Sequence, residues 1–133
     1  MDLVLLLGRL LFGALFIVSG MGHFAKREAM VGYAKYKTVP MAGLGVALSG
    51  LVFLIGGAAI VLGVFAGWAS LAIAIVLAVT AFVMHAYWKE SDAAAKQNEM
   101  MAFNKDISLV GASLIAFYLF HQFSSQIGML IAK

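Results

Sequence analysis

Two histidines and a short polar segment are the residues best suited to chemistry in this sequence. His23 ends an apolar run in SGMGHF, and His85 ends another in MHAYW. Asn104 and Asp106 stand in FNKD, just before a further apolar run. A histidine can relay a proton, and a nearby carboxylate can orient it and favour its charged form. We therefore predict that these residues form one polar pocket, with Trp88 on its lipid side.

The same two histidines have simpler interpretations. Each could anchor a helix end at a membrane surface, or donate a hydrogen bond to a carbonyl left free at a helix end. Two histidines at one depth could also ligate a haem. The sequence has no cysteine and no zinc-protease motif, so we predict no metal site. A carbonyl compound such as a quinone, or an anionic lipid headgroup, is a possible ligand of the pocket.

Arg9 interrupts the apolar run LLLGRLLFGALF. A charge at the bilayer centre costs about 2.5–3.5 kcal/mol. Arg9 lies nearer the membrane edge, so its long side chain could snorkel to the headgroups. The alternative is a buried cation that binds an anionic headgroup, a quinone carbonyl or the carboxylate of a partner. Both interpretations remain open from the sequence.

The composition indicates a membrane protein. Of the 133 residues, 64% are hydrophobic and 11% are charged, whereas a soluble domain has about 25% charged residues. Such a chain cannot cover a water-exposed surface, so the lipid bilayer must be its main partner. The net charge of +3 is too small to indicate nucleic acid. We predict an all-α integral membrane four-helix bundle that binds no nucleic acid.

Four apolar segments have the length of a membrane-spanning helix, which needs about 20 residues. The predicted helices cover approximately residues 3–22, 40–64, 66–87 and 107–130. Pro40 suits the first turn of the second helix, where its missing N–H is no loss. The GVFAG segment at 63–67 predicts a tight hairpin. Together the helices form one domain over residues 1–133.

Two loops, 23–39 and 88–106, carry most of the positive charge. Their basic residues are Lys26, Arg27, Lys35, Lys37, Lys89, Lys96 and Lys105. The opposite side has Lys133, and Arg9 if it snorkels. The positive-inside rule therefore predicts that both loops lie in the cytoplasm and that both termini lie outside.

Short elements inside these loops can also be predicted. Loop 23–39 could form an interfacial helix with its tyrosines toward the headgroups. In loop 88–106, Ser91 could cap a short helix, and Asn104 could cap the fourth long helix. Small residues at four-residue spacing, which let helices approach closely in lipid, occur in two rows. These rows are Ala66, Ser70, Ala74 and Ala78, and Ser108, Ala112 and Ala116.

Several sequence blocks occur in a recognisable order: an arginine in the first helix, SGMGHF, YAKYKTVP, a glycine-rich second helix, MHAYW and FNKDISLVGASL. This order resembles the DoxX family of small four-helix bacterial membrane proteins, over nearly the whole chain. Some relatives carry a glutamate before the GG of the second helix, where this chain has Phe53. A basic residue that often follows the second hairpin is replaced here by Gly67 and Trp68.

The resemblance implies a location close to membrane redox enzymes, because the family name comes from association with a thiosulfate–quinone oxidoreductase. It supplies no catalytic residue, and no phosphate loop or nucleophile elbow is present. The resemblance further implies the bacterial inner membrane. The leading hypothesis is a supporting subunit or partner of a quinone-linked membrane redox enzyme, with a non-catalytic role favoured over a catalytic one. The alternatives are a structural subunit of a larger membrane complex and a quinone-reactive oxidoreductase.

Overall fold

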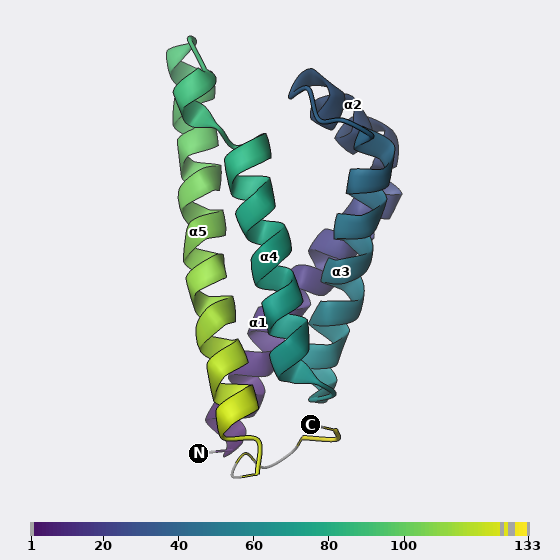
Figure 1. Ribbon diagram of the computed structural model, residues 1–133, viewed down its shortest axis with the longest axis vertical. Helices are drawn as coiled ribbons and strands as arrows, with labels where there is room; N and C mark the ends of the chain where they lie inside the picture. The colour runs from purple at the N-terminus through teal and green to yellow at the C-terminus, as the bar shows by residue number, and fades with distance from the viewer. Residues whose placement is uncertain (1, 126, 128–129, 133) are drawn as a thin grey trace.

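The computed structural model describes residues 2–125, 127 and 130–132. Its elements are α1 (Asp2–Ala25), α2 (Arg27–Tyr36), α3 (Ala42–Leu62), α4 (Ala66–Met84), the single 3-10 turn η1 (Tyr87–Lys89) and α5 (Ala93–Gln122). Four of these helices, α1, α3, α4 and α5, are long and apolar enough to cross a membrane. The predicted all-α membrane fold is thereby confirmed (Figure 1).

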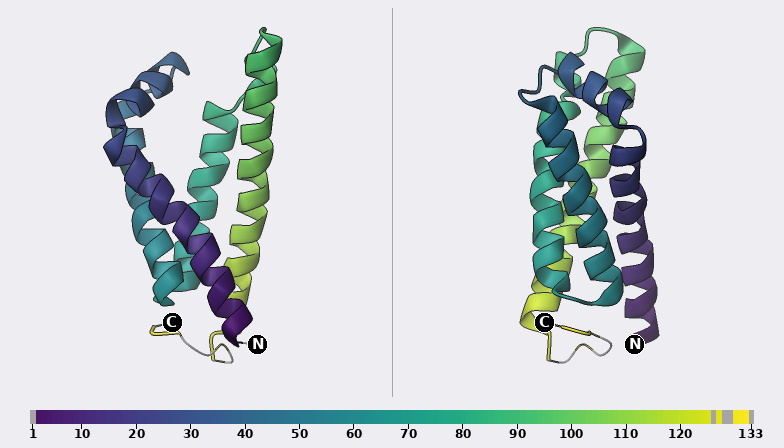
Figure 2. Two further views of the ribbon diagram at one scale, coloured as in Figure 1. Left: turned by 180° about the vertical axis from the view of Figure 1, so that it is seen from behind. Right: turned by 90° about the vertical axis from the view of Figure 1, so that its right-hand side faces the viewer.

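The long helices form two pairs. Helix α1 packs along α3, and α4 packs along α5, while α3 and α4 join the pairs. The pairs meet at the end where α1 begins and α5 ends, and they separate toward the end that carries α2 (Figures 1 and 2). The bundle is therefore open at the α2 end. A buried cluster of Phe16, Phe53, Ile60, Ile73 and Leu77 holds the pairs together.

Glycines bring α1 and α3 into backbone contact. A Cβ atom placed on Gly20 would lie 2.6 Å from the amide nitrogen of Leu54, and one on Gly57 would lie 2.7 Å from the carbonyl oxygen of Gly13. No real side chain fits at such distances, so these positions require glycine. Small residues thus allow the close packing that lipid-embedded helices need.

The two predicted rows of small residues have different surroundings. In the first row Ala66, Ser70 and Ala74 are buried, as a packing role requires. In the second row Ser108 and Ala112 are exposed. Most of this second row is therefore outside the packed interior of the bundle.

Helix α5 begins much earlier than the predicted helix 107–130. Its N-cap is Asp92, whose side chain accepts a hydrogen bond of 2.8 Å from the backbone N–H of Ala95. The predicted cap at Ser91 is wrong by one residue. The predicted short helix and the predicted fourth long helix are one continuous helix. The charges of this segment suggested a loop, but alanine, lysine, glutamine, glutamate and methionine are strong helix formers outside lipid as well.

The later part of α5 also differs from the prediction. Asn104 lies inside the helix and caps nothing, and its carbonyl accepts a hydrogen bond from the hydroxyl of Ser108. The helix ends at Gln122, where the polar sequence QFSSQ replaces the apolar run. At 30 residues, α5 is about 45 Å long. It therefore extends beyond the hydrocarbon core, which is about 30 Å thick.

The connections agree with the sequence in outline. The predicted interfacial helix in loop 23–39 exists as α2. Helix α3 begins at Ala42, two residues after Pro40, because Met41 adopts a left-handed conformation with φ of 52°. The predicted hairpin contains Gly63 with φ of 72° at the end of α3. Glycine adopts that conformation without steric cost.

Candidate functional site

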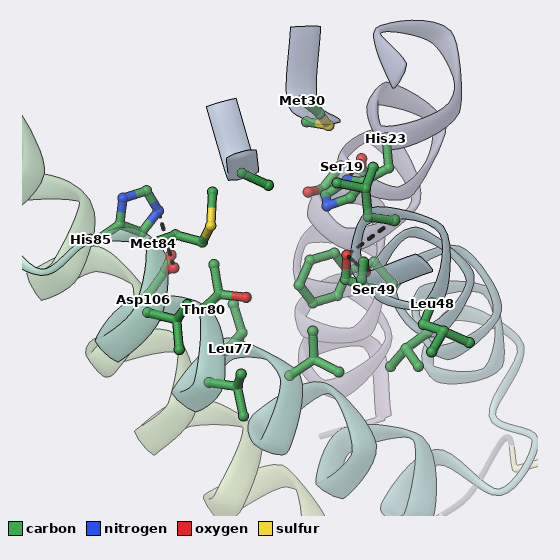
Figure 3. Close-up of a pocket in the computed structure, with 18 of the residues that line it drawn as sticks. Ser19, His23, Met30, Leu48, Ser49, Leu77, Thr80, Met84, His85 and Asp106 are labelled. Atoms are coloured by element: carbon green, nitrogen blue, oxygen red, sulfur yellow. Dashed lines mark hydrogen bonds and ion pairs between the residues drawn. The ribbon is translucent and has the colours of Figure 1, made fainter. Parts of the chain in front are cut away.

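A cavity of about 540 Å³ lies between the two helix pairs at the end where they separate (Figure 3). Small-molecule sites in proteins have volumes of about 300–1,000 Å³. Most of its walls are apolar. The polar residues that line it are Ser19, His23, Tyr33, Ser49, Thr80, His85, Lys105 and Asp106.

The rim of the cavity is apolar and exposed. Leu15, Leu48, Ile75 and Val79 line the cavity, and each is about half exposed. All four belong to helices that are long enough to span the membrane. In a bilayer these side chains face lipid chains, so a lipophilic molecule can reach the cavity from the membrane.

His23 forms part of the α1 wall. Its Nδ1 atom lies 2.8 Å from the carbonyl oxygen of Ser19. A carbonyl only accepts hydrogen bonds, so Nδ1 carries the proton and donates it. The ring packs edge-on against Phe53, with ring centres 5.5 Å apart. A neutral His23 therefore has its lone pair on Nε2.

His85 and Asp106 form the opposite wall. His85 directly follows α4, and its Nδ1 lies 2.7 Å from Oε2 of Glu99. Its Nε2 lies 3.7 Å from Oδ2 of Asp106. A neutral imidazole has one N–H and can donate to only one of these carboxylates, whereas an imidazolium can donate toward both. Asp106 is only 3% exposed, and its Oδ1 lies 3.4 Å from Nζ of Lys105.

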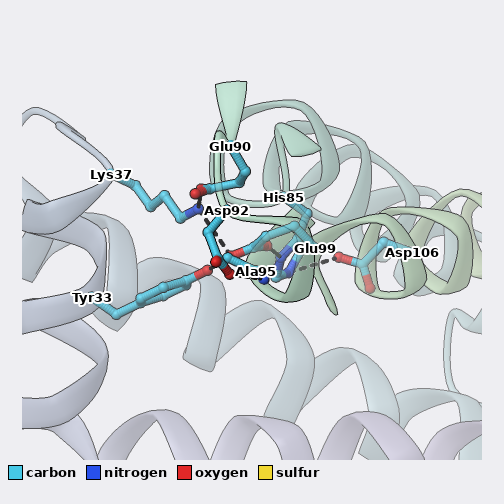
Figure 4. Close-up of polar contacts among 8 residues, drawn as sticks. All are labelled: Tyr33, Lys37, His85, Glu90, Asp92, Ala95, Glu99 and Asp106. Carbon is cyan, nitrogen blue, oxygen red and sulfur yellow. Dashed lines mark hydrogen bonds and ion pairs between the residues drawn. The ribbon is translucent and has the colours of Figure 1, made fainter. Parts of the chain in front are cut away.

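An interhelical ion cluster, formed by Tyr33, Lys37, Glu90 and Glu99, joins α2 to α5 (Figure 4). The Lys37 ammonium lies 2.6 Å from Oε1 of Glu90 and 2.9 Å from Oε1 of Glu99. The Tyr33 hydroxyl donates a hydrogen bond to the same Glu99 carboxylate. Glu99 in turn contacts His85. The cluster therefore links the α2 side of the cavity mouth to the α5 side.

The cluster shifts the acidity of its members outside the membrane. Burial raises the pKa of Tyr33 to about 12, and the adjacent carboxylate of Glu99 adds to this shift. Burial alone would lower the pKa of Lys37, but hydrogen bonds to Glu90 and Glu99 outweigh burial and raise it. The neutral phenol and the charged ammonium are thus the forms that this site favours.

The structure brings together three of the sequence-predicted site residues: His23, His85 and Asp106 all line the cavity. Asn104 is exposed on α5 and does not line it. Trp88 is 49% exposed and likewise lies outside the lining, where it packs on other aromatic rings. These rings are Phe82, Tyr87 and Phe103. Because α5 is continuous around Asp106, the backbone N–H groups there are bonded within the helix.

The ion cluster was missed from the sequence. Glu99 and Asp106 are seven residues apart, which places them on one face of a continuous helix. That signal is weak in the sequence, because the charges of residues 88–106 also fit a loop. Among the described residues, no group of three or more histidine, aspartate or glutamate side chains is arranged to hold a metal ion.

Arg9 lies outside the cavity lining and is only 4% exposed. Its Nε donates to the carbonyl of Ile60 at 2.9 Å, and its Nη2 donates to the carbonyl of Val61 at 2.7 Å. The snorkelling interpretation is therefore wrong. Arg9 instead ties α1 to the last turn of α3, where helix carbonyls lack a full set of partners.

The DoxX family model matches residues 4–86, which is more than half of the chain. The match begins in α1 and ends just after His85, so it covers α1, α2, α3 and α4 but not α5. No curated protein and no solved structure matches the chain. The family match agrees with the four apolar helices and with the order of the sequence blocks, and the chain belongs to the DoxX family.

Proposed function

We propose that this protein is a supporting subunit of a quinone-linked redox system in the bacterial inner membrane, and that it holds a quinone-type lipid. The observation that carries the proposal is the cavity of about 540 Å³ with an apolar, lipid-facing rim and polar residues in its walls. A quinone has the same division, since its ring oxygens are polar and its tail is apolar. The family resemblance adds the redox context.

The proposed orientation places the α2 end in the cytoplasm. The α2 end carries the seven basic residues of the two loops 23–39 and 88–106. At the other end, Arg9 is buried and Lys133 lies outside the described residues. The positive-inside rule then favours a cytoplasmic α2 end.

A supporting role is favoured over an independent oxidoreductase. The side chains in the cavity walls can bind, orient and exchange protons, but imidazole, carboxylate and hydroxyl groups do not take up a pair of electrons. The chain also has no cysteine. Electrons would therefore pass between the bound quinone and a partner enzyme.

Ligand binding to the protein in lipid nanodiscs tests the proposal. We expect a short-tailed quinone or its hydroquinone to bind saturably, as measured by calorimetry against empty nanodiscs. Val76→Phe adds a ring to a residue that lines the cavity and should weaken binding by about tenfold or more. Ile115→Phe, on the lipid-exposed surface of α5, is the matched control and should bind normally. Uptake equal to that of empty nanodiscs would refute the proposal.

A purely structural subunit is the second candidate. The observation in its favour is the exposed small-residue face of α5, where a Cβ atom on Gly111 would meet nothing within 4 Å. Such a face can receive another helix at close range. Gly111→Leu should then abolish co-purification of a partner, while Gly8→Leu, at an equally open position on α1, should not. Unchanged co-purification would exclude this face as the contact.

A further inference from the structure

We infer that the cavity selects a ligand that donates hydrogen bonds, a lipophilic hydroquinone, over the oxidised quinone. The inference rests on the proposed function and specifies the form of its ligand. This selectivity depends on which polar atoms of the cavity walls already form hydrogen bonds within the protein and which are available to a ligand.

The first wall presents acceptors. The only N–H of a neutral His23 is used on the carbonyl of Ser19, so Nε2 offers a lone pair. Ser49 lies on the same side (Figure 3). Its hydroxyl proton is directed to the carbonyl of Gly45 at 2.8 Å. The oxygen of Ser49 therefore also faces a ligand as an acceptor.

The second wall presents a carboxylate. Asp106 lines the cavity and is 3% exposed. Its ion pairs with His85 and Lys105 are 3.7 and 3.4 Å long. Charge-assisted hydrogen bonds of this kind are about 2.7–2.9 Å long, so neither contact saturates the carboxylate. Among the described residues, no shorter contact to its oxygens is present. A buried carboxylate with free lone pairs favours a donor.

The acceptors of the two walls lie on opposite sides of the cavity opening. Figure 3 shows His23 and Ser49 on one side, and His85 with Asp106 on the other. Apolar residues such as Phe53 and Leu77 also line the cavity. A hydroquinone carries two O–H donors at opposite ends of a flat apolar ring. In the inferred complex, one donor faces the His23 side and the other faces Asp106.

An oxidised quinone fits these atoms less well, because it carries only acceptors. Its carbonyl oxygens would face the Nε2 lone pair of His23 and the negative charge of Asp106. The hydroxyls of Ser19 and Thr80, which also line the cavity, can each donate or accept and do not distinguish the two forms. Lys105 could donate, but its side chain is 63% exposed, so water can satisfy its ammonium without a ligand. The walls therefore discriminate by hydrogen-bond direction.

A series of three ligands with one tail tests the inference on the unmodified protein in nanodiscs, without oxygen. The ligands are a ten-carbon alkyl hydroquinone, its quinone, and its dimethyl ether, which keeps the reduced ring but has no O–H donor. We expect the hydroquinone to bind at least about tenfold more tightly than either of the others. All three have the same tail, and binding to empty nanodiscs measures the part of partition into lipid that comes from the rings.

Two variants test the contributions of the two walls separately. Asp106→Asn supplies an N–H donor and should reduce the preference for hydroquinone by raising the relative affinity of the quinone. His23→Phe should lower hydroquinone affinity without improving the quinone. Equal affinity for all three ligands, or tighter binding of the quinone, would overturn this inference while the proposed function stands. Absence of saturable binding for every ligand would overturn both.

Discussion

Arg9 shows how one buried side chain fixes the position of two helices. It lies on α1, and its guanidinium donates to the carbonyls of Ile60 and Val61 at the end of α3. The sequence identified Arg9 as unusual, but it could not distinguish a snorkelling side chain from a buried one. That distinction depends on which face of α1 meets α3, and therefore on helix packing.

Replacing Arg9 should destabilise the protein, and lysine should not rescue it. Hydrogen bonds to a charged group contribute about 1.5–3 kcal/mol, so Arg9→Leu should lower the free energy of unfolding by at least about that amount. Lysine lacks the planar fork that reaches two carbonyls at once. Thermal unfolding in detergent measures the effect, with the exposed Arg27→Leu as control. A fully stable Arg9→Lys variant would contradict this role.

Tyr33 should titrate far above an ordinary tyrosine. Burial and the Glu99 carboxylate raise its pKa to about 12, compared with about 10 for a free tyrosine. Because the folded-state pKa is raised, the contribution of Tyr33 to stability is complete below about pH 10 and is lost as the pH rises toward 12. The phenolate absorbance after a rapid pH jump, taken as the difference between wild type and Tyr33→Phe, measures this titration. A Tyr33 transition near pH 10 would contradict the contact with Glu99.

At the scale of elements, hydropathy predicted the number, type and approximate position of three long helices. It failed for α5 because an apolar run marks only the lipid-embedded part of a helix. The polar half of α5, which includes Glu99, continues beyond the lipid. Its N-cap at Asp92 and its helix-forming residues are visible in the sequence, but the charges of this segment also fit a loop.

The contact between α1 and α3 should tolerate no side chain at its glycines. Gly20→Ala would place a Cβ atom 2.6 Å from the backbone of Leu54, so α1 must move away. We expect a loss of about 1–3 kcal/mol in unfolding free energy, as for other overpacked contacts. Gly8→Ala is the matched control, because nothing lies within 4 Å of its Cβ position. Equal stability of the two variants would show that α1 and α3 are further apart.

The ion cluster should hold α2 against α5. Glu99 receives contacts from Tyr33, Lys37 and His85, so Glu99→Gln removes the charge at the centre of the cluster. We expect faster backbone hydrogen exchange in α2 by about tenfold, which corresponds to about 1.4 kcal/mol of lost protection. Glu28→Gln, an exposed change within α2 itself, should leave exchange unchanged. Identical exchange rates in both variants would show that Glu99 does not hold α2 in place.

At the scale of the whole molecule, the bundle is open at one end, and the opening is the cavity. His23 and His85 each end an apolar run, which predicts that both lie at one membrane surface. The sequence could not show that α1 with α3 and α4 with α5 form separate pairs, since four helices have several packing orders. The convergence of His23, His85 and Asp106 therefore depends on tertiary packing, and so does the exclusion of Asn104 and Trp88.

Photoaffinity mapping tests the central claim most directly, namely that a quinone-type lipid occupies the cavity between the helix pairs. A short-tailed hydroquinone bearing a diazirine is irradiated with the protein in nanodiscs, and labelled peptides are identified by mass spectrometry. We predict labelling within the cavity walls, near Ser19, Val52 and Thr80, competed by unlabelled hydroquinone and lost in Val76→Phe. Uniform labelling of lipid-facing residues such as Ile115, unaffected by competitor, would contradict the account.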